Sequence, residues 1–223
     1  MKKLIVLLSM LLLLCISYSQ IPGNLNNSYS SSQRSIGIKG GLNFASLSGE
    51  DVDDFDSKTG FIFGGFATYP INEQFSFQPE VMFTMKGAKY EYSDSDGDEY
   101  MSEKNIVSLN YLEMPLLGVM NIPMQATFDP KLYFGPSLAI NLSATSEYEY
   151  EYEDYYVSYS ESGEEDLEDV NGLEFGLIFG GALEFNSLIL DLRYNIGLSK
   201  IFSDDDYIEI SNRVFSLMLG YKL

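Results

Sequence analysis

Residues 172–200 read GLEFGLIFGGALEFNSLILDLRYNIGLSK. Apolar residues occupy nearly every second position in both halves of this stretch, and Asn186-Ser187 separates the halves. Because successive side chains of a β-strand point to opposite faces of a sheet, this period of two predicts two antiparallel strands joined by a short turn. Glu174, Asp191 and Arg193 fall on the polar side of the pattern. The stretch therefore predicts strands with one apolar face and one polar face that carries charges of both signs.

The same period recurs along the rest of the chain. The eight predicted strands are residues 35–46, 59–69, 75–92, 106–120, 131–143, 172–185, 188–200 and 213–223. Most of them exceed the ~5–6 residues that are common in globular proteins. A strand of ~9–11 residues that is tilted by about 45° crosses a bilayer. The fourth strand alternates poorly, and Pro115 within it predicts a β-bulge.

The connections between these strands alternate in length. Three are short, at 70–74, 121–130 and 186–187, and four are long and acidic, at 47–57, 91–104, 144–171 and 203–209. Short periplasmic turns and long extracellular loops are typical of outer-membrane barrels. Residues 35–223 are therefore predicted to form an all-β, eight-stranded antiparallel up-and-down transmembrane β-barrel with four long acidic outer loops and three shorter periplasmic turns.

The alternative is a soluble, lipocalin-like ligand-binding barrel, in which the same alternation is inverted. The polar faces of the strands favour the membrane barrel, because oppositely charged side chains are able to pair across the narrow lumen of eight strands. We expect these side chains to form a polar plug that holds the barrel rigid. They are Glu80, Lys86, Glu113, Glu174, Asp191 and Arg193.

The N-terminus has the composition of a secretory signal. Lys2 and Lys3 precede the apolar run 4–16, which is too short for a membrane-spanning helix of ~20 residues. Ser17-Tyr18-Ser19 predicts cleavage before Gln20, so residues 1–19 are a signal peptide. The Ser- and Asn-rich residues 20–34 are predicted to be a flexible leader. The protein is thus expected in the bacterial outer membrane, inserted by the barrel assembly machinery.

Composition excludes several functions. The formal net charge is -20, and it becomes -22 when Lys2 and Lys3 leave with the signal, which argues against nucleic acid as a partner. The chain has no His, and its single Cys, Cys15, lies in the signal. His- and thiolate-based catalysis and metal binding are therefore excluded. We expect a monomer without cofactor or enzymatic activity.

Two acidic loops contain candidate binding residues. Residues 146–169 alternate Glu and Tyr in EYEYEYE, which predicts a ribbon that extends the flanking strands. Its candidate contact residues are Tyr148, Tyr150, Tyr152, Tyr155 and Tyr156. One interpretation is that these tyrosines anchor adhesion or the capture of a cationic partner. The alternative is that the loop is only a solvated anionic surface. Asp94, Asp96 and Asp98 are weak candidates for a divalent cation, because their spacing departs from that of an EF-hand.

The sequence resembles the PorT-like outer membrane β-barrel proteins of Bacteroidetes. The resemblance covers residues 35–223 and rests on IGIKGGLNFA, FSFQPEVMFTMKGA, LNYLEMPLL, LYFGPSLAINL and LDLRYNIGLSKI. It implies a barrel that contacts outer membrane lipid and lipopolysaccharide. A structural or surface-interaction role through the outer loops is expected from these features. The alternatives are an accessory component of an outer-membrane protein secretion system and an outer-membrane enzyme.

Overall fold

The computed structural model describes residues 34–49, 55–96, 99–124, 126–167, 169–202 and 210–223. The predicted signal peptide and all but the last residue of the predicted leader lie outside these residues. The strands are β1 (Ser35–Ser48), β2 (Asp56–Pro70), β3 (Phe75–Asp96), β4 (Glu99–Asn121), β5 (Asp129–Glu153), β6 (Ser158–Asp166), β7 (Leu173–Phe185), β8 (Leu188–Gly197) and β9 (Ser211–Lys222). In the described part of the chain, no helix is long and apolar enough to cross a membrane.

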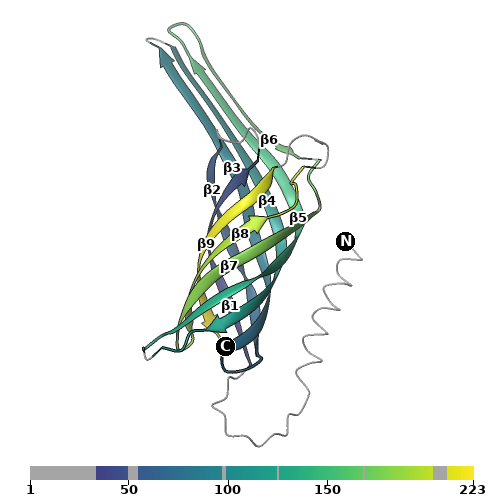
Figure 1. The fold of residues 1–223 in the computed structure, drawn as a ribbon. Coiled ribbons are helices and arrows are strands. Elements are labelled where there is room, and N and C mark those ends of the chain that lie inside the picture. The colour runs from purple at the N-terminus through teal and green to yellow at the C-terminus, as the bar shows by residue number, and fades with distance from the viewer. Residues whose placement is uncertain (1–33, 50–54, 97–98, 125, 168, 203–209) are drawn as a thin grey trace, which may run out of the picture. The chain divides into compact units, whose positions relative to one another are not determined.

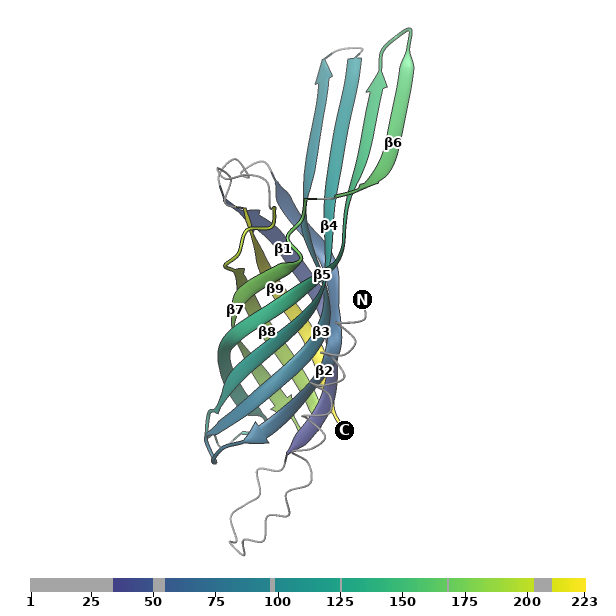
Figure 2. The same cartoon turned by 90° about the vertical axis from the view of Figure 1, so that its right-hand side faces the viewer.

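Eight of these strands close into a ring (Figures 1 and 2). Each pairs antiparallel with its neighbours in the order β1, β2, β3, β4, β5, β7, β8, β9, and β9 pairs with β1. The seam between the first and last strands runs from Gly37 paired with Lys222 to Ser48 paired with Ser211. The predicted eight-stranded up-and-down barrel is confirmed, with the turns β2–β3, β4–β5 and β7–β8 at one end.

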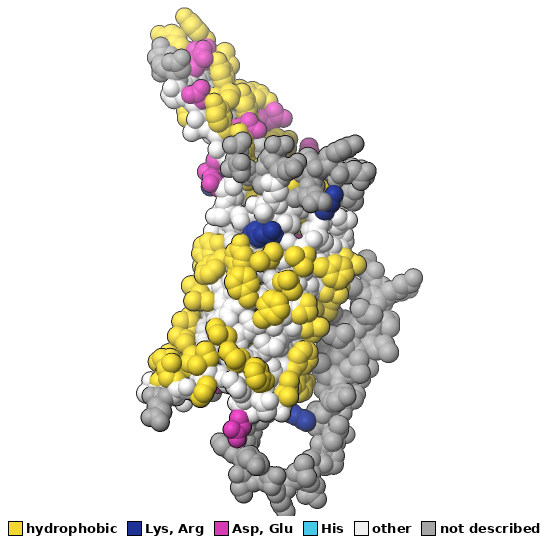
Figure 3. Space-filling view, viewed as in Figure 1, with side chains coloured by type: hydrophobic (Ala, Val, Ile, Leu, Met, Phe, Trp, Pro, Cys, Tyr) yellow, Lys and Arg dark blue, Asp and Glu magenta, His cyan; other side chains and the backbone are white. Residues whose placement is uncertain are grey.

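The two faces of the wall differ as the alternation predicts. Lys39, Lys86 and Arg193 are at most 4% exposed because they point into the lumen, whereas Ile38, Phe63 and Leu219 are 58–70% exposed on the outside. Figure 3 shows hydrophobic side chains gathered in a band across the face of the wall in view, with Asp and Glu above and below it. This arrangement is the inverse of a lipocalin-like barrel, so the soluble alternative is wrong.

A sheet projects beyond the ring (Figure 2), and its pairings comprise four strands. It consists of the upper part of the β3–β4 hairpin, the upper part of β5, and β6, which pairs only with β5. We call it the extension: residues 90–96, 99–107, 146–153 and 158–165. The predicted loops 91–104 and 144–171 are thus largely strands, because each hairpin continues its ladder of backbone hydrogen bonds past the apolar belt.

A β-bulge lies where the barrel passes into the extension. Tyr111 pairs with Asn141 but Asn110 pairs with Ser143, which leaves Leu142 as an extra residue in β5. Pro115 pairs with Ser137 in regular register. The bulge predicted at Pro115 is therefore wrong. Proline removes one hydrogen-bond donor without adding a residue, and a bulge requires an added residue.

Candidate functional site

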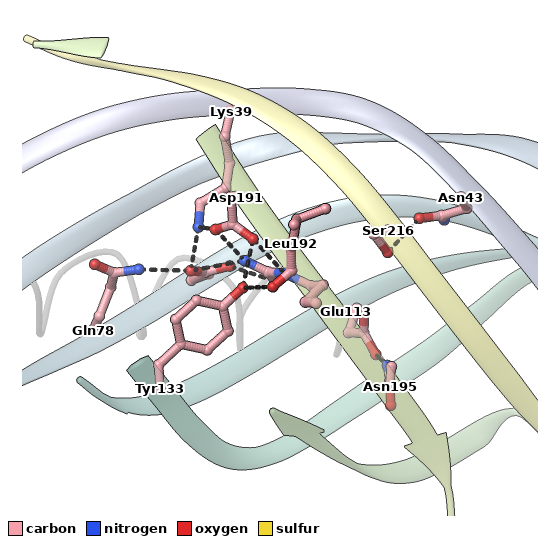
Figure 4. Close-up of polar contacts among 11 residues, drawn as sticks. Lys39, Asn43, Gln78, Glu113, Tyr133, Asp191, Leu192, Asn195 and Ser216 are labelled. Carbon is pink, nitrogen blue, oxygen red and sulfur yellow. Dashed lines mark hydrogen bonds and ion pairs between the residues drawn. The ribbon is translucent and has the colours of Figure 1, made fainter. Parts of the chain in front are cut away.

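Four charged side chains from three strands meet in the lumen (Figure 4). Lys39 on β1 places its Nζ 2.8 Å from Glu80 Oε1 on β3 and 2.7 Å from Asp191 Oδ2 on β8. Arg193 on β8 donates to the same two carboxylates, with Nη1 2.9 Å from Glu80 Oε2 and Nη2 3.1 Å from Asp191 Oδ2. All four side chains are at most 1% exposed. We call this set the lower cluster.

The lower cluster balances its charge and its hydrogen bonds. Two cations face two carboxylates, and Tyr133 Oη and Gln78 Nε2 donate further hydrogen bonds to Asp191 and Glu80. Buried charges are costly to desolvate unless they are paired and hydrogen-bonded. Because every carboxylate here has a cation and a neutral donor, the cluster is suited to fixing the positions of the strands rather than to exchanging protons.

A second set, the upper cluster, surrounds Lys86. Its Nζ lies 2.6 Å from Glu174 Oε1 and 3.3 Å from Glu113 Oε1. Asn212 Nδ2 donates to Glu174 at 2.5 Å, and Asn195 Nδ2 donates to Glu113 at 2.6 Å. A third polar group lies between the two clusters along β3. In it Asn43 on β1 donates a hydrogen bond to Thr84 on β3 and accepts one from Ser216 on β9.

Apolar residues fill the lumen above the upper cluster. Buried Leu109 and Ile201 pack with side chains from the two loop segments that follow β6 and β8. Those segments are joined by a bridge between Val170 and Phe202. The remaining members of this group are Leu47, Val107, Tyr111, Ala139, Ala144, Leu167 and Ile210. We call the group the apolar cap, because it separates the charged lumen from the outer solvent.

One recess, at the turn end of the lumen, is too small for a substrate. It is lined by Lys39, Tyr133, Glu184 and Asp191 among others and has a volume of ≈ 20 Å³. A single water needs about 10–15 Å³. At the same end Lys131 and Lys222 both bind Glu184. The arrangement is chemically that of a salt-bridged plug.

The structure brings the six predicted plug residues together in these two clusters. Glu80, Asp191 and Arg193 belong to the lower cluster, and Lys86, Glu113 and Glu174 belong to the upper one. The prediction missed Lys39, Tyr133, Asn195 and Asn212, which complete the clusters. All four lie on the polar side of their strands. The predicted alternation included Lys39, Tyr133 and Asn195, whereas Asn212 precedes the predicted strand 213–223 by one residue.

The extension brings six tyrosines onto one of its faces, which we call the tyrosine face. Cross-strand pairs of an antiparallel sheet point to the same side. Glu103 on β4 pairs with both Tyr92 and Tyr150, and Tyr152 pairs with Tyr159. By the same register the face comprises Tyr90, Tyr92, Tyr148, Tyr150, Tyr152 and Tyr159, with Glu103, Asn105, Glu161 and Glu165 between them. It continues the lumen side of the barrel wall.

Local contacts order the tyrosine face. Tyr148 lies over Gly163, where an added Cβ would be 2.5 Å from the phenol oxygen. The rings of Tyr150 and Tyr159 are 6.2 Å apart, within the range of favourable aromatic pairs. Tyr159 donates a hydrogen bond to Glu161, and this bond raises the pKa of Tyr159 above its usual value. Burial and the charges of Glu99 and Asp154 also raise the pKa of Tyr152. The phenols of Tyr152 and Tyr159 are therefore held in the neutral form at neutral pH.

The opposite side, the glutamate face, is more uniformly charged. It carries Glu91, Glu147, Glu149, Glu151, Glu153 and Glu164, together with Lys89 and Lys104. Its ion pairs are exposed, as in Lys89 with Glu91 at 2.7 Å and Lys104 with Glu149 at 3.3 Å. Exposed pairs of this kind contribute little to stability.

The remaining candidates are more scattered. Tyr155 and Tyr156 lie in the β5–β6 turn, 79% and 85% exposed, with their rings edge to face. Asp94 accepts a hydrogen bond from the backbone of Ser95. Asp98 and the side chain of Asp96 lie outside the described residues. Among the side chains that are described, no group of three or more acidic, His or Cys residues is arranged to hold a metal ion.

A closed ring with an apolar outside, a charged inside and short turns at one end defines an integral outer membrane β-barrel. The model of the outer membrane protein beta-barrel domain matches residues 19–203. The chain belongs to that family.

The solved structures that match the chain are distant in sequence. Ail, the attachment invasion locus protein of Yersinia pestis, is 13% identical, with 86% of this chain and 99% of that chain covered at a TM-score of 0.40. Neisserial surface protein A is 14% identical, with 86% of this chain and 99% of that chain covered at a TM-score of 0.42. OprG from Pseudomonas aeruginosa is 11% identical, with 85% of this chain and 95% of that chain covered at a TM-score of 0.41. No curated protein matches the chain.

Proposed function

We propose that this outer membrane barrel is a non-enzymatic surface-interaction protein whose tyrosine face binds a cationic segment of a partner protein. The observation that carries the proposal is the collection of six tyrosines from three strands on one side of the extension, with carboxylates between them. Tyrosines are frequent anchors of protein interfaces because they bury a large area at a small cost in side-chain entropy.

The chemistry of the tyrosine face favours a cation. The face of a tyrosine ring attracts Lys and Arg, with a free energy of about 0.5–1 kcal/mol at exposed sites. Glu103 and Glu161 lie next to Tyr150 in the register and supply negative charge beside the ring. Tyr148, Tyr150 and Tyr152 are only partly exposed, so their rings are held in place before a partner arrives. Their preorganisation lowers the entropic cost of binding.

The lumen supports a non-enzymatic role. A general acid or base needs contact with a substrate and freedom to change its protonation state. Glu80 and Asp191 are enclosed by Lys39 and Arg193 instead. The adjacent recess has room for about one water molecule and is therefore too small for a substrate.

The proposal is tested by binding of a fluorescent oligo-arginine peptide to the full chain refolded in neutral phospholipid vesicles. We expect the triple variant Tyr148→Ser, Tyr150→Ser, Tyr152→Ser to bind at least about tenfold more weakly, because three ring contacts together contribute about 1.5–3 kcal/mol. The variant with Phe at the same three positions retains most of the affinity, since phenylalanine keeps the ring.

The matched control changes the other face. Glu149→Gln with Glu151→Gln removes two charges from the glutamate face and leaves the tyrosines in place. Long-range attraction alone predicts that this control, which removes charge, weakens binding at least as much as the serine variant, which removes none. Such a result would contradict the proposal. The proposal would also be contradicted if the protein bound a neutral glycan, independently of salt, and did not bind the peptide. Such a result would show that the tyrosine rings stack on sugars.

Two finer assignments accompany this proposal. The motifs in residues 35–223 support membership of the PorT-like branch of outer membrane barrels, without transfer of a role in secretion. The apolar run and the Ser17-Tyr18-Ser19 motif support export with cleavage before Gln20. Mass spectrometry of the protein from outer membranes tests the second assignment. We expect a mature chain that begins at residue 20, and a chain that retains residues 1–19 would overturn it.

A further inference from the structure

The outer wall of the barrel is hollowed at one place within the apolar belt. A groove of ≈ 640 Å³ is lined by Ile38, Gly40, Phe63, Leu188, Leu219 and Tyr221 among others. This volume lies within the about 300–1,000 Å³ range of small-molecule sites. The groove crosses the seam at which the first and last strands of the barrel join.

The register explains the hollow. Gly40 pairs with Phe63 on one side and with Leu219 on the other, so the position between two large outward side chains has no side chain. In the next row toward the turns, Ile38 pairs with Tyr221, which pairs with Leu188 beside the β7–β8 turn. The groove therefore leads from Gly40 toward the end of the barrel that carries the short turns.

We propose that this groove is a binding site for one acyl chain of a phospholipid from the periplasmic leaflet. The groove is continuous with the lipid-facing belt, because its walls Ile38, Phe63 and Leu219 are 58%, 58% and 70% exposed on the membrane side of an outer membrane barrel. Its opening lies near the turn end, which faces the periplasm in barrels of this kind. The periplasmic leaflet is thus the source of the chain.

Packing provides the preference for a held chain. In a membrane the lipid tails are as apolar as the protein surface, so a hydrophobic driving force is absent and close van der Waals contact decides. A chain over Gly40 gains contacts with walls on both sides, whereas a chain on a convex part of the belt touches one row of side chains. Filling the groove therefore removes the preference and leaves the rest of the belt unchanged.

The test uses the full chain refolded in vesicles of phosphatidylethanolamine and phosphatidylglycerol. The protein is extracted in a mild detergent, and native mass spectrometry measures the ratio of lipid-bound to lipid-free barrel. We expect the wild-type protein to retain one phospholipid and Gly40→Leu to lose that species. Gly118→Leu is the matched control, because Gly118 also faces outward on β4 and an added Cβ there meets only ordinary contact at 3.6 Å.

A second variant protects the test against a folding defect. An added Cβ at Gly40 would be 3.3 Å from Ile62 O and from Phe63 Cβ, so the leucine variant needs a small adjustment of the backbone. Leu219→Ala instead lowers one wall of the groove at a side chain that is 70% exposed. We expect it to retain less phospholipid than wild type. Equal retention by wild type, Gly40→Leu and Leu219→Ala would overturn the proposal. A wild-type species with the mass of two protein chains, in place of one protein chain with one phospholipid, would overturn it too.

Discussion

Lys39 and Asp191 form an ion pair across two strands that are not neighbours. The Nζ of Lys39 on β1 is 2.7 Å from Oδ2 of Asp191 on β8, and β9 lies between these strands in the ring. The same ammonium group reaches Glu80 on β3, beyond β2 on the other side. One side chain therefore ties together an arc of five consecutive strands, from β3 to β8 through the seam.

Replacement of this lysine tests how much the tie contributes. Lys39→Met leaves Glu80 and Asp191 with one cation, Arg193, in a site at most 1% exposed. Removing one partner of a buried pair typically costs about 3–5 kcal/mol. We expect a loss of that size in the free energy of unfolding, measured by urea titration of the barrel in vesicles.

Lys89→Met is the matched control for that experiment. Lys89 pairs with Glu91, but the two side chains are 33% and 44% exposed. An exposed pair contributes less than about 1 kcal/mol. Equal destabilisation by the two substitutions would show that the lumen is hydrated well enough to make the lower cluster unimportant for stability.

The bulge at Leu142 shifts the alternation of β5 before the tyrosines. The side-chain period of a strand is two, so one extra residue exchanges the faces of everything that follows, relative to the alternation that precedes it. Deletion of Leu142 removes the extra residue and leaves the pairs beyond it unchanged, so we expect Tyr148, Tyr150 and Tyr152 to stay on the tyrosine face and peptide binding to persist. Heat-modifiable migration on gels is expected to persist as well, since β5 pairs with β7 only up to Ile140. Loss of peptide binding from an intact barrel would show that the bulge orients the tyrosines in some way other than by its one extra residue.

Gly87 is required where β3 leaves the barrel. Its φ is 128°, a conformation that favours glycine, and a Cβ there would be 2.0 Å from Val107 O. Gly87→Ala is expected to lower the free energy of unfolding by at least about 1–3 kcal/mol. Gly118→Ala is the control, because a Cβ there would meet only ordinary contact at 3.6 Å. Similar unfolding midpoints for the two alanine variants would mean that β3 relaxes freely at this point.

The hydrogen bond from Tyr159 to Glu161 predicts a pH dependence. The bond favours the neutral phenol and raises the pKa of Tyr159 above its usual value of 10.0. The bond is therefore complete below about pH 10 and is lost as the pH rises through the raised pKa. Glu161→Gln is expected to lower the pKa of Tyr159. NMR of ring-labelled tyrosine, assigned with Tyr159→Phe, measures the shift, and an unchanged midpoint in the glutamine variant would refute this account.

The alternation of side chains predicted the barrel because membrane and lumen impose opposite demands on successive residues. Ile38 faces lipid and Lys39 faces the lumen for that reason. The closed ring and the inward direction of Glu80, Lys86 and Arg193 follow from the same rule. The partner of each charge does not follow from it, because Lys39 bonds to strands that are two places away in the ring.

The extension was harder to predict because both of its faces are exposed to solvent. Residues 91–104 have no apolar side to indicate a strand, although Glu91 on β3 pairs with Lys104 on β4. The EYEYEYE alternation did indicate a ribbon, and β5 continues through it to Glu153. The direction of its tyrosines required the bulge at Leu142, which leaves no mark in the sequence pattern.

The ion pair of Lys39 and Asp191 crosses the β1–β9 seam, and this has a consequence for biogenesis. Before the seam closes, Lys39 lacks Asp191 and Arg193 lacks Glu80, so each cation has only one of its two carboxylates. Incompletely paired charges are costly in hydrocarbon. Closure removes that penalty in the same step that satisfies the backbone edges. The bilayer therefore selects for complete barrels. Within it, chains in which β1 is paired with β9 are strongly favoured over open sheets.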